Sequence, residues 1–219
     1  TLIAKYHRIG ILVALTLLSI GVLFLSYENQ YRGRFYPGVI LGGEDVGGKS
    51  YGDARALFEQ RARVLTGNGL QFIFRNGIME KEVRVPMFTV GLTPDNLVSY
   101  FTLGNWAETI REAYSFGRSG SLWRRGEEQA RAFFIPKRFA MPGAVNGEAL
   151  QSLLSRELKR FFTAATPAQF TWDAYAMVIT PEQNGAQVPS LEILDAVNKR
   201  LAVFDAGAIR LTTTTEAPE

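Results

Sequence analysis

The feature that most constrains this sequence is an uncharged run of 19 residues near its N-terminus, from Ile9 to Tyr27. As a helix, this run would be about 28 Å long, close to the thickness of the apolar layer of a bilayer. A buried core helix rarely lacks a polar face over such a length, and a cleaved signal peptide usually has a shorter apolar region that ends in a cleavage site of small residues. The sequence therefore predicts an uncleaved transmembrane helix at residues 9–27, in contact with membrane lipid.

The charges on the two sides of this run hardly distinguish its orientation. Lys5 and Arg8 precede it, whereas Glu28, Arg32 and Arg34 follow it, so the count behind the positive-inside rule is nearly tied. The short N-terminal tail and the kind of domain that follows favour an N-terminus in the cytoplasm. We expect a single-pass membrane protein whose globular part is extracytoplasmic.

The composition of the globular part excludes several classes of function. Without Lys5 and Arg8, the chain holds 22 basic and 21 acidic side chains, a balance that argues against nucleic-acid binding. It contains no cysteine, and its single histidine, His7, precedes the apolar run. These counts exclude thiolate catalysis, zinc sites with cysteine ligands and histidine-dependent triads in the globular part. We expect a non-enzymatic protein with no metal or other cofactor.

Helix and strand signals alternate irregularly along the globular part. Ser50 and Asn146 have the features of helix N-caps, and Asn76-Gly77 is typical of a β-hairpin turn. This mixture predicts an α+β fold, in which a transmembrane helix is followed by one or two small mixed α/β extracytoplasmic domains. The expected segments are a cytoplasmic tail (1–8), the transmembrane helix (9–27), a linker (28–36), a first α+β unit (37–134) and a second α+β unit (135–219).

Local signals also place the individual elements within these units. Thr93-Pro94 has the pattern of an N-cap followed by proline at the first helical position, and Gly67 could end the helix that Ser50 begins. The expected helices begin at Ser50, Thr93, 105, Asn146 and Ser190, and the expected strands lie at 70–75, 78–85, 137–141, 170–172, 176–179 and 208–214.

The glycine-rich stretch Gly42–Ser50 invites comparison with a phosphate-binding loop. Glu44 and Asp45 inside this stretch would repel phosphate, and an extracytoplasmic location would deny it ATP. We therefore expect a tight turn that leads into a capped helix, and no bound nucleotide.

The segment from Arg118 to Arg138 is the most basic part of the globular region, with six basic residues and two acidic ones. One interpretation is a solvated helix face. The other is a contact surface for anionic wall polymer, peptidoglycan carboxylates or lipid headgroups. The contact residues that this second hypothesis proposes are Arg118, Trp123, Arg124, Arg125 and Arg131.

Trp172 and Tyr175 lie close together in a segment with strand character. Aromatic rings on a strand can stack on the faces of sugar rings, although packing in a core is the more common role for tryptophan. We include both residues among the candidate contacts. Hydrolysis by a pair of carboxylates stays open, because the chain has 21 acidic residues and no local motif selects a pair.

Three segments of this chain together resemble the VanW-like envelope proteins. The residues that carry the resemblance are Tyr36–Val39 with Val46–Ala54, which are similar to the family's opening motif; Ala113–Gly120, which is similar to its A-x-x-x-G-R-x-G signature; and Ile179–Gly185, which precedes the helix expected at Ser190.

The resemblance implies an N-terminal anchor followed by a peptidoglycan-binding domain that faces the wall. The same domain precedes L,D-transpeptidase modules, whose catalysis needs a cysteine that this chain lacks, and the family would continue into a further module beyond Glu219. Pro189-Ser190 departs from the family's pattern before the last helix.

The leading hypothesis is thus a bacterial, membrane-anchored, non-catalytic envelope protein that binds or faces peptidoglycan. The first alternative is a structural or accessory subunit of a larger assembly of membrane proteins, and the second is an envelope hydrolase. Retention on purified sacculi would favour the leading hypothesis, and stable co-purification with other membrane proteins would favour the first alternative.

Overall fold

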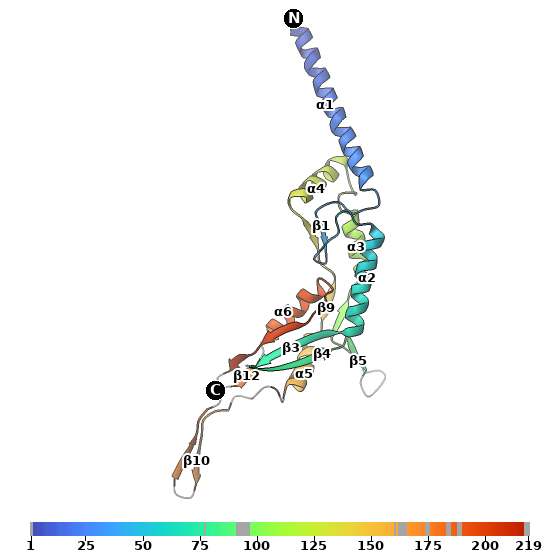
Figure 1. Cartoon of the computed structure of the whole chain (residues 1–219). Coiled ribbons are helices and arrows are strands. Elements are labelled where there is room, and N and C mark those ends of the chain that lie inside the picture. The colour runs from blue at the N-terminus through green and yellow to red at the C-terminus, as the bar shows by residue number, and fades with distance from the viewer. Residues whose placement is uncertain are drawn as a thin grey trace.

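The computed structural model describes residues 2–76, 78–90, 97–159, 161, 166–173, 176–182, 185–187 and 190–216. Figure 1 shows an elongated molecule with the N-terminal helix at one end and a β-hairpin at the other. The six helices that these residues form are α1 (Leu2–Gln30), α2 (Tyr51–Asn68), α3 (Trp106–Ser115), α4 (Leu122–Phe134), α5 (Gly147–Leu158) and α6 (Ser190–Leu201).

The described strands form small sheets of two or three strands each. One three-stranded sheet has the order β2-β1-β8 and the other β13-β3-β4, and the pairs β5-β6, β7-β9, β10-β11 and β12-β14 form two-stranded sheets. This mixture confirms the α+β class. The strands are β1 (Val39–Leu41), β2 (Glu44–Asp45), β3 (Leu70–Asn76), β4 (Met79–Val85), β5 (Phe88–Val90), β6 (Leu97–Ser99), β7 (Phe101–Leu103), β8 (Lys137–Phe139), β9 (Gly143–Val145), β10 (Gln169–Asp173), β11 (Ala176–Thr180), β12 (Gly185–Gln187), β13 (Ile209–Thr212) and β14 (Thr214–Glu216).

Helix α1 projects away from the rest of the chain (Figure 1). Among the described helices it is the one long and apolar enough to cross a membrane, and no part of the segment Gly10–Gln30 is buried. A core helix of a soluble protein would be mostly buried, so this interpretation does not fit α1. A signal sequence near an N-terminus can also pass this test of length and composition, so α1 is a candidate for a membrane anchor or a signal sequence.

The core lies below α1 and forms one continuous cluster of apolar side chains. Helix α2 buries the face that carries Ala54, Phe58 and Leu65, and strand β3 contributes Phe72 and Phe74. Two parallel strand pairs, β1 with β8 and β13 with β3, cross the expected boundary between residues 134 and 135. The division into units at this boundary stays a prediction.

Several local predictions are confirmed by the backbone. Ser50 caps α2, because its hydroxyl accepts a hydrogen bond from the backbone N–H of Asp53. The side chain of Asn146 accepts one from Ala149 and caps α5 in the same way. Strands β3 and β4 pair in antiparallel register up to Asn76 and Met79, as the hairpin signal predicts, and Gly77 itself lies outside the described residues.

Other local predictions are wrong. Helix α2 continues past Gly67 to Asn68, and Gly69 is its C-cap with a φ of 70°, which suits glycine. A Cβ at Gly69 would lie 2.2 Å from the carbonyl oxygen of Val85, so there is no room for one. The helix expected from Thr93 begins outside the described residues, and residues 97–103 form strands β6 and β7. The helix expected at Ser190, by contrast, is present, and Ser190 is its first residue.

Candidate functional site

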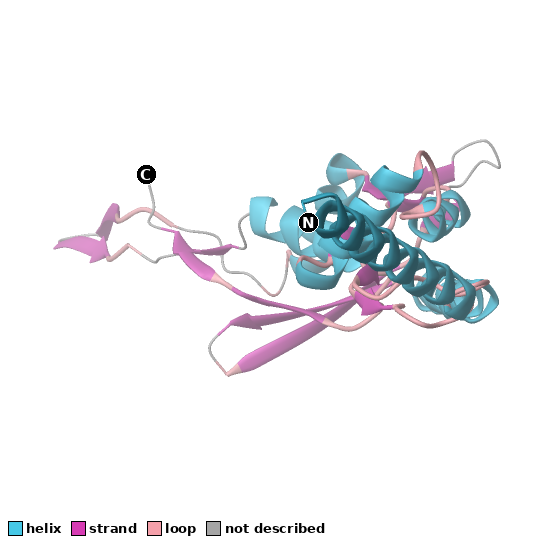
Figure 2. Cartoon of the chain, turned by 90° about the horizontal axis from the view of Figure 1, so that it is seen from above, coloured by secondary structure: helices cyan, strands magenta, loops and turns pink. Residues whose placement is uncertain are grey.

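The β-hairpin formed by β10 and β11 stands clear of the rest of the fold. It lies at the end of the molecule opposite α1 (Figure 1), and Figure 2 shows it beyond the end of the sheets and away from the helices. Phe170 pairs with Ile179 and Trp172 with Met177 in antiparallel register. Because directly opposed residues and residues two apart on a strand share a face, these four side chains form one apolar face.

This apolar face is open to solvent. Phe170 is 65% exposed, Trp172 80%, Met177 50% and Ile179 55%. Thr171 and Val178, directly opposed, occupy the other face. An isolated two-stranded hairpin is marginally stable in water, and exposed contiguous apolar surface usually marks a contact site. We call Phe170, Trp172, Met177 and Ile179 the hairpin platform.

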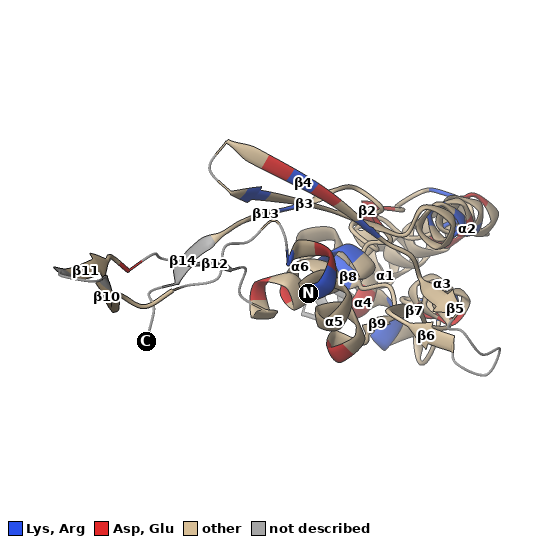
Figure 3. Ribbon diagram, turned by 90° about the horizontal axis from the view of Figure 1, so that it is seen from below, with Lys and Arg blue, Asp and Glu red and all other residues tan. Residues whose placement is uncertain are grey.

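Trp172 lies on the hairpin platform and is not packed in the core, so its role as a contact stays a prediction. Tyr175, the other aromatic candidate, lies outside the described residues. Neither strand of the hairpin contains a lysine or an arginine, and Figure 3 shows that the basic residues lie on other parts of the chain. The platform is thus suited to apolar and stacking contacts rather than to ion pairing.

A basic hollow lies between β4 and the end of α5. It is lined by Lys81, Arg156, Glu157, Lys159 and Phe161. Three of these five side chains are cationic, so the hollow could accept a carboxylate. No local pattern in the sequence reveals this group, because Lys81 is far from the others in the chain and only the packing of β4 on α5 brings them together.

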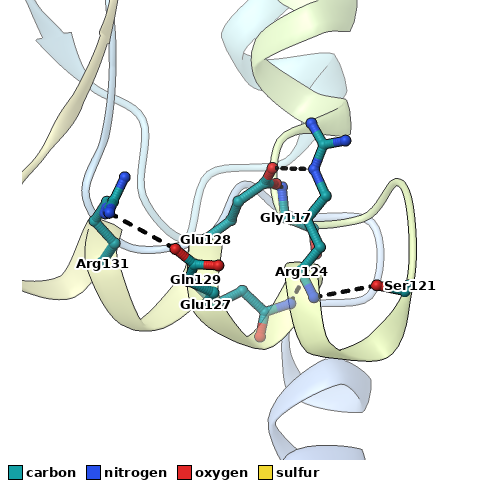
Figure 4. Close-up of polar contacts among 7 residues, drawn as sticks. All are labelled: Gly117, Ser121, Arg124, Glu127, Glu128, Gln129 and Arg131. Carbon is teal, nitrogen blue, oxygen red and sulfur yellow. Dashed lines mark hydrogen bonds and ion pairs between the residues drawn. The ribbon is translucent and has the colours of Figure 1, made fainter.

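The arginines of α4 are engaged in ion pairs within the fold. Arg124 contacts Glu128 at 2.9 Å, and Arg131 contacts Glu127 at 3.6 Å, both across one helical turn (Figure 4). Arg125 pairs with Glu28 of α1. Three of the six basic residues of this segment are therefore paired with carboxylates, which weakens the case for an anion-binding patch.

Arg118 lies at the junction between α1 and the globular part. Its guanidinium carbon is 4.2 Å from the ring centroids of both Tyr36 and Tyr114. It also donates hydrogen bonds to the backbone carbonyls of Tyr31, Arg34 and Tyr114. These contacts hold the chain where it leaves α1, and they use the planar shape and several donors of the guanidinium.

Trp123 lies on α4 with the candidate arginines Arg124, Arg125 and Arg131, and it is 89% exposed at the start of this helix. It does not contribute to the hairpin platform. It faces α1, because one hollow is lined by Trp123 together with Leu17, Ile20 and Phe24.

The glycine-rich stretch Gly42–Ser50 forms the turn that its sequence predicts. Residues Gly43–Ser50 spell G-x-x-x-x-G-K-S, but Lys49 contacts Glu44 at 2.8 Å and is not available to a phosphate. The backbone N–H of Gly47 donates to Asp45 at 2.9 Å. Carboxylates thus occupy the positions that a phosphate-binding loop would offer to its ligand. In the described part of the chain, no group of three or more metal-ligating side chains converges.

Comparison with known families adds the decisive observation about this region. Residues 98–203 match a family model described as "Putative peptidoglycan binding domain". The matched segment runs from β6 to just past α6 and contains the β10–β11 hairpin, α5 and α4. No curated protein and no solved structure matches the chain.

The match supports peptidoglycan as the substance that this segment binds or faces. Such a domain meets its ligand outside the cytoplasmic membrane, which implies an extracytoplasmic location for the matched residues. The segment starts at residue 98, well before the boundary expected at residue 135.

Proposed function

We propose that this chain is a membrane-anchored, non-catalytic cell-envelope protein that binds peptidoglycan through the hairpin platform. The observation that carries the proposal is the position of this exposed apolar face inside the segment that matches a peptidoglycan-binding family. Glycan strands present sugar rings whose C–H faces are apolar, and an indole or phenyl ring is the side chain that packs best on such a face.

The position of the platform also fits the proposal. Helix α1 would cross the membrane with its N-terminus in the cytoplasm, and the hairpin lies at the far end of the molecule from α1 (Figure 1). This arrangement would direct the platform away from the membrane and toward the wall. The basic hollow at Lys81, Arg156 and Lys159 would add contacts with the carboxylates of the peptide stems.

The motifs that resemble VanW-like proteins support membership of that family, which we also propose. Two of these motifs meet in space, because Arg118 of the second motif lies over the ring of Tyr36 in the first. The non-catalytic role is supported by the absence of cysteine from the chain and by the position of its one histidine before the globular part.

Retention on purified sacculi tests the proposal. In detergent, the Trp172→Ala variant should bind more weakly than the parent by about 1–2 kcal/mol, or roughly 5- to 30-fold, because it loses the stacking surface of the indole. Trp123→Ala is the matched control, since it removes a tryptophan of similar exposure, 89% against 80% for Trp172, from another part of the matched segment. Equal retention of the two variants and the parent would contradict the proposal.

A second candidate function is a structural subunit of a larger membrane assembly, and the hairpin also favours it. In the described chain β10 and β11 pair only with each other, so their outer edges could accept a strand from another protein. Co-purification in mild detergent that is lost in Trp172→Ala, with no retention on sacculi, would favour this alternative.

A further inference from the structure

Helix α4 has three distinct faces. One face packs on the globular part, where Gln129 is 7% exposed, Ala132 is 1% exposed and Arg125 pairs with Glu28. A second, polar face carries Arg124, Glu127 and Arg131. The third face is apolar, and no described element covers it. Its large side chains are Leu122, Trp123, Phe133 and Phe134.

The apolar face is unusually open for a helix of a folded domain. Leu122 is 68% exposed, Trp123 89%, Phe133 72% and Phe134 81%. Four large apolar side chains on one helix face form a contiguous patch of the kind that marks a contact surface. We call these four side chains the α4 apolar face.

This face lies beside α1. An apolar hollow between the two helices is lined by Leu17, Ile20, Gly21 and Phe24 from α1 and by Leu122, Trp123, Gly126 and Ala130 from α4. A second hollow next to it adds Phe133 and Phe134. The helices meet where a Cβ on Gly126 would lie 3.9 Å from the ring of Phe24. Figure 1 shows α4 crossing the base of α1 at an angle and not running along it.

The position of α4 along α1 indicates what covers the α4 apolar face. This face lies beside Ile20 and Phe24, which belong to the uncharged run that would span the bilayer. The distance along the helix from Ile20 to Tyr27 is about 10 Å, and interfacial amphipathic helices lie about 5–10 Å deep at the boundary between headgroups and acyl chains. The depth that α1 imposes on α4 therefore matches the depth at which such helices bind.

We propose that α4 is an interfacial membrane helix whose apolar face lies in the outer leaflet, with lipid acyl chains filling the hollow between α1 and α4. This inference rests on the proposed membrane anchor. Its polar face would then lie at the level of the headgroups. There Arg124 and Arg131, which are 69% and 73% exposed in their pairs with Glu128 and Glu127, can exchange these weak pairs for lipid phosphates while keeping their aliphatic stems in the interface. Aromatic side chains at the ends of α4, Trp123 and Phe134, are typical of this depth.

The proposal has a mechanical consequence. A single helix followed by a turn would leave the globular part free to swing about its attachment. With α4 also bound to the surface, the globular part is held at two places, and the hairpin platform keeps a fixed direction away from the membrane.

Single-cysteine variants test this directly, because the chain contains no cysteine. The full-length protein in vesicles of phosphatidylcholine and phosphatidylglycerol is labelled with a nitroxide at Trp123→Cys or Phe134→Cys. Its accessibility to oxygen, which partitions into lipid, and to a water-soluble nickel chelate is then measured. Both parent side chains are exposed, so the substitutions leave the core intact.

Three further sites serve as references. Arg131→Cys is the matched site on the polar face of α4, Ile20→Cys reports on the anchor, and Thr171→Cys reports on the hairpin.

We expect the nitroxide label to be highly accessible to oxygen and poorly accessible to the nickel chelate at three sites, Trp123→Cys, Phe134→Cys and Ile20→Cys. Nickel accessibility should be several-fold higher at Arg131→Cys and highest at Thr171→Cys. If the label at Ile20→Cys is in lipid while the labels at Trp123→Cys and Phe134→Cys are in water, the membrane anchor is supported and the proposed role of α4 is wrong. If Ile20→Cys is also in water, the anchor itself fails, and with it both proposals.

Discussion

Arg125 of α4 forms an ion pair with Glu28 in the last turns of α1, across 97 positions of the sequence. The two side chains are only 23% and 22% exposed. The Nε atom of Arg125 is buried, and within the described residues it has no hydrogen-bond partner. This pair is the polar link between the helix that would cross the membrane and the helix that would lie on its surface.

Breaking this link should destabilise the junction. In Glu28→Gln, Arg125 keeps its charge in a largely desolvated position without its partner, so we expect the free energy of unfolding to fall by about 1–3 kcal/mol. Thermal melts in detergent measure this. The control is Glu127→Gln, which breaks the exposed pair with Arg131 and should cost about 0.5 kcal/mol or less. Similar losses in the two variants would show that the junction pair has no special role.

Arg118→Lys should also destabilise the protein, because lysine keeps the charge but cannot lie flat between two tyrosine rings or donate to three carbonyls at once. We expect a loss of about 1–3 kcal/mol, measured by chemical unfolding. Arg111→Lys on the exposed side of α3 serves as the control. Retention of the folded variant on sacculi should match the parent. A variant of normal stability that no longer binds would instead support the sequence-based hypothesis that Arg118 contacts the ligand.

Gly38 should be far less tolerant of alanine than Gly48. The two glycines have φ angles of 80° and 77°, so each substitution carries the strain of a left-handed residue, about 1–2 kcal/mol. A Cβ at Gly38 would also lie 2.0 Å from the carbonyl oxygen of Ala132, whereas no described atom lies within 4 Å of one at Gly48. The crowding should add about 1–3 kcal/mol. Chemical unfolding compares the two variants, and equal losses would refute the crowding argument.

Local chemistry in the sequence was enough to predict the parts of the fold that depend on neighbouring residues. Ser50 and Asn146 cap their helices because a side-chain oxygen next to the first turn is all that a cap requires. The β3–β4 hairpin follows from a turn between two runs of strand character. Strand segments 170–172 and 176–179 were also found, within one residue or two of their observed bounds.

Properties that depend on distant residues could not be predicted in this way. The arginines of α4 looked like a free basic patch because Glu28 is far from Arg125 in the chain, and its approach depends on where α1 ends. For Trp172 the sequence leaves both a core position and a contact role open, because strand character says nothing about whether another element covers the strand. The hollow between α1 and α4 depends on the angle at which two helices meet, which no local pattern specifies.

Glu44 provides a pH-dependent link between the β1–β2 turn and α2. Its carboxylate contacts Lys49 at 2.8 Å and Arg61 of α2 at 2.9 Å. Hydrogen bonds from Lys49 and then from Arg61 hold the pKa of Glu44 below its ordinary value of 4.5. Because the folded state lowers this pKa, the pair stabilises the protein fully above the ordinary value, and this contribution is lost as the pH falls through the folded-state pKa.

The Glu44→Gln variant should therefore differ from the parent at neutral pH and converge with it in acid. At pH 7 we expect its Tm to be lower by about 1–3 °C, a small change because the Glu44 side chain is 35% exposed and partly screened by water. The difference should stay constant down to about pH 5 and shrink below pH 4.5, as the carboxylate of the parent becomes protonated. Melting curves recorded from pH 7 to pH 3 measure it, with Glu148→Gln in the first turn of α5 as a control for the general effect of removing a carboxylate. A Tm difference that persists unchanged at the lowest pH would show that glutamine disturbs the turn by its shape and not by the loss of charge.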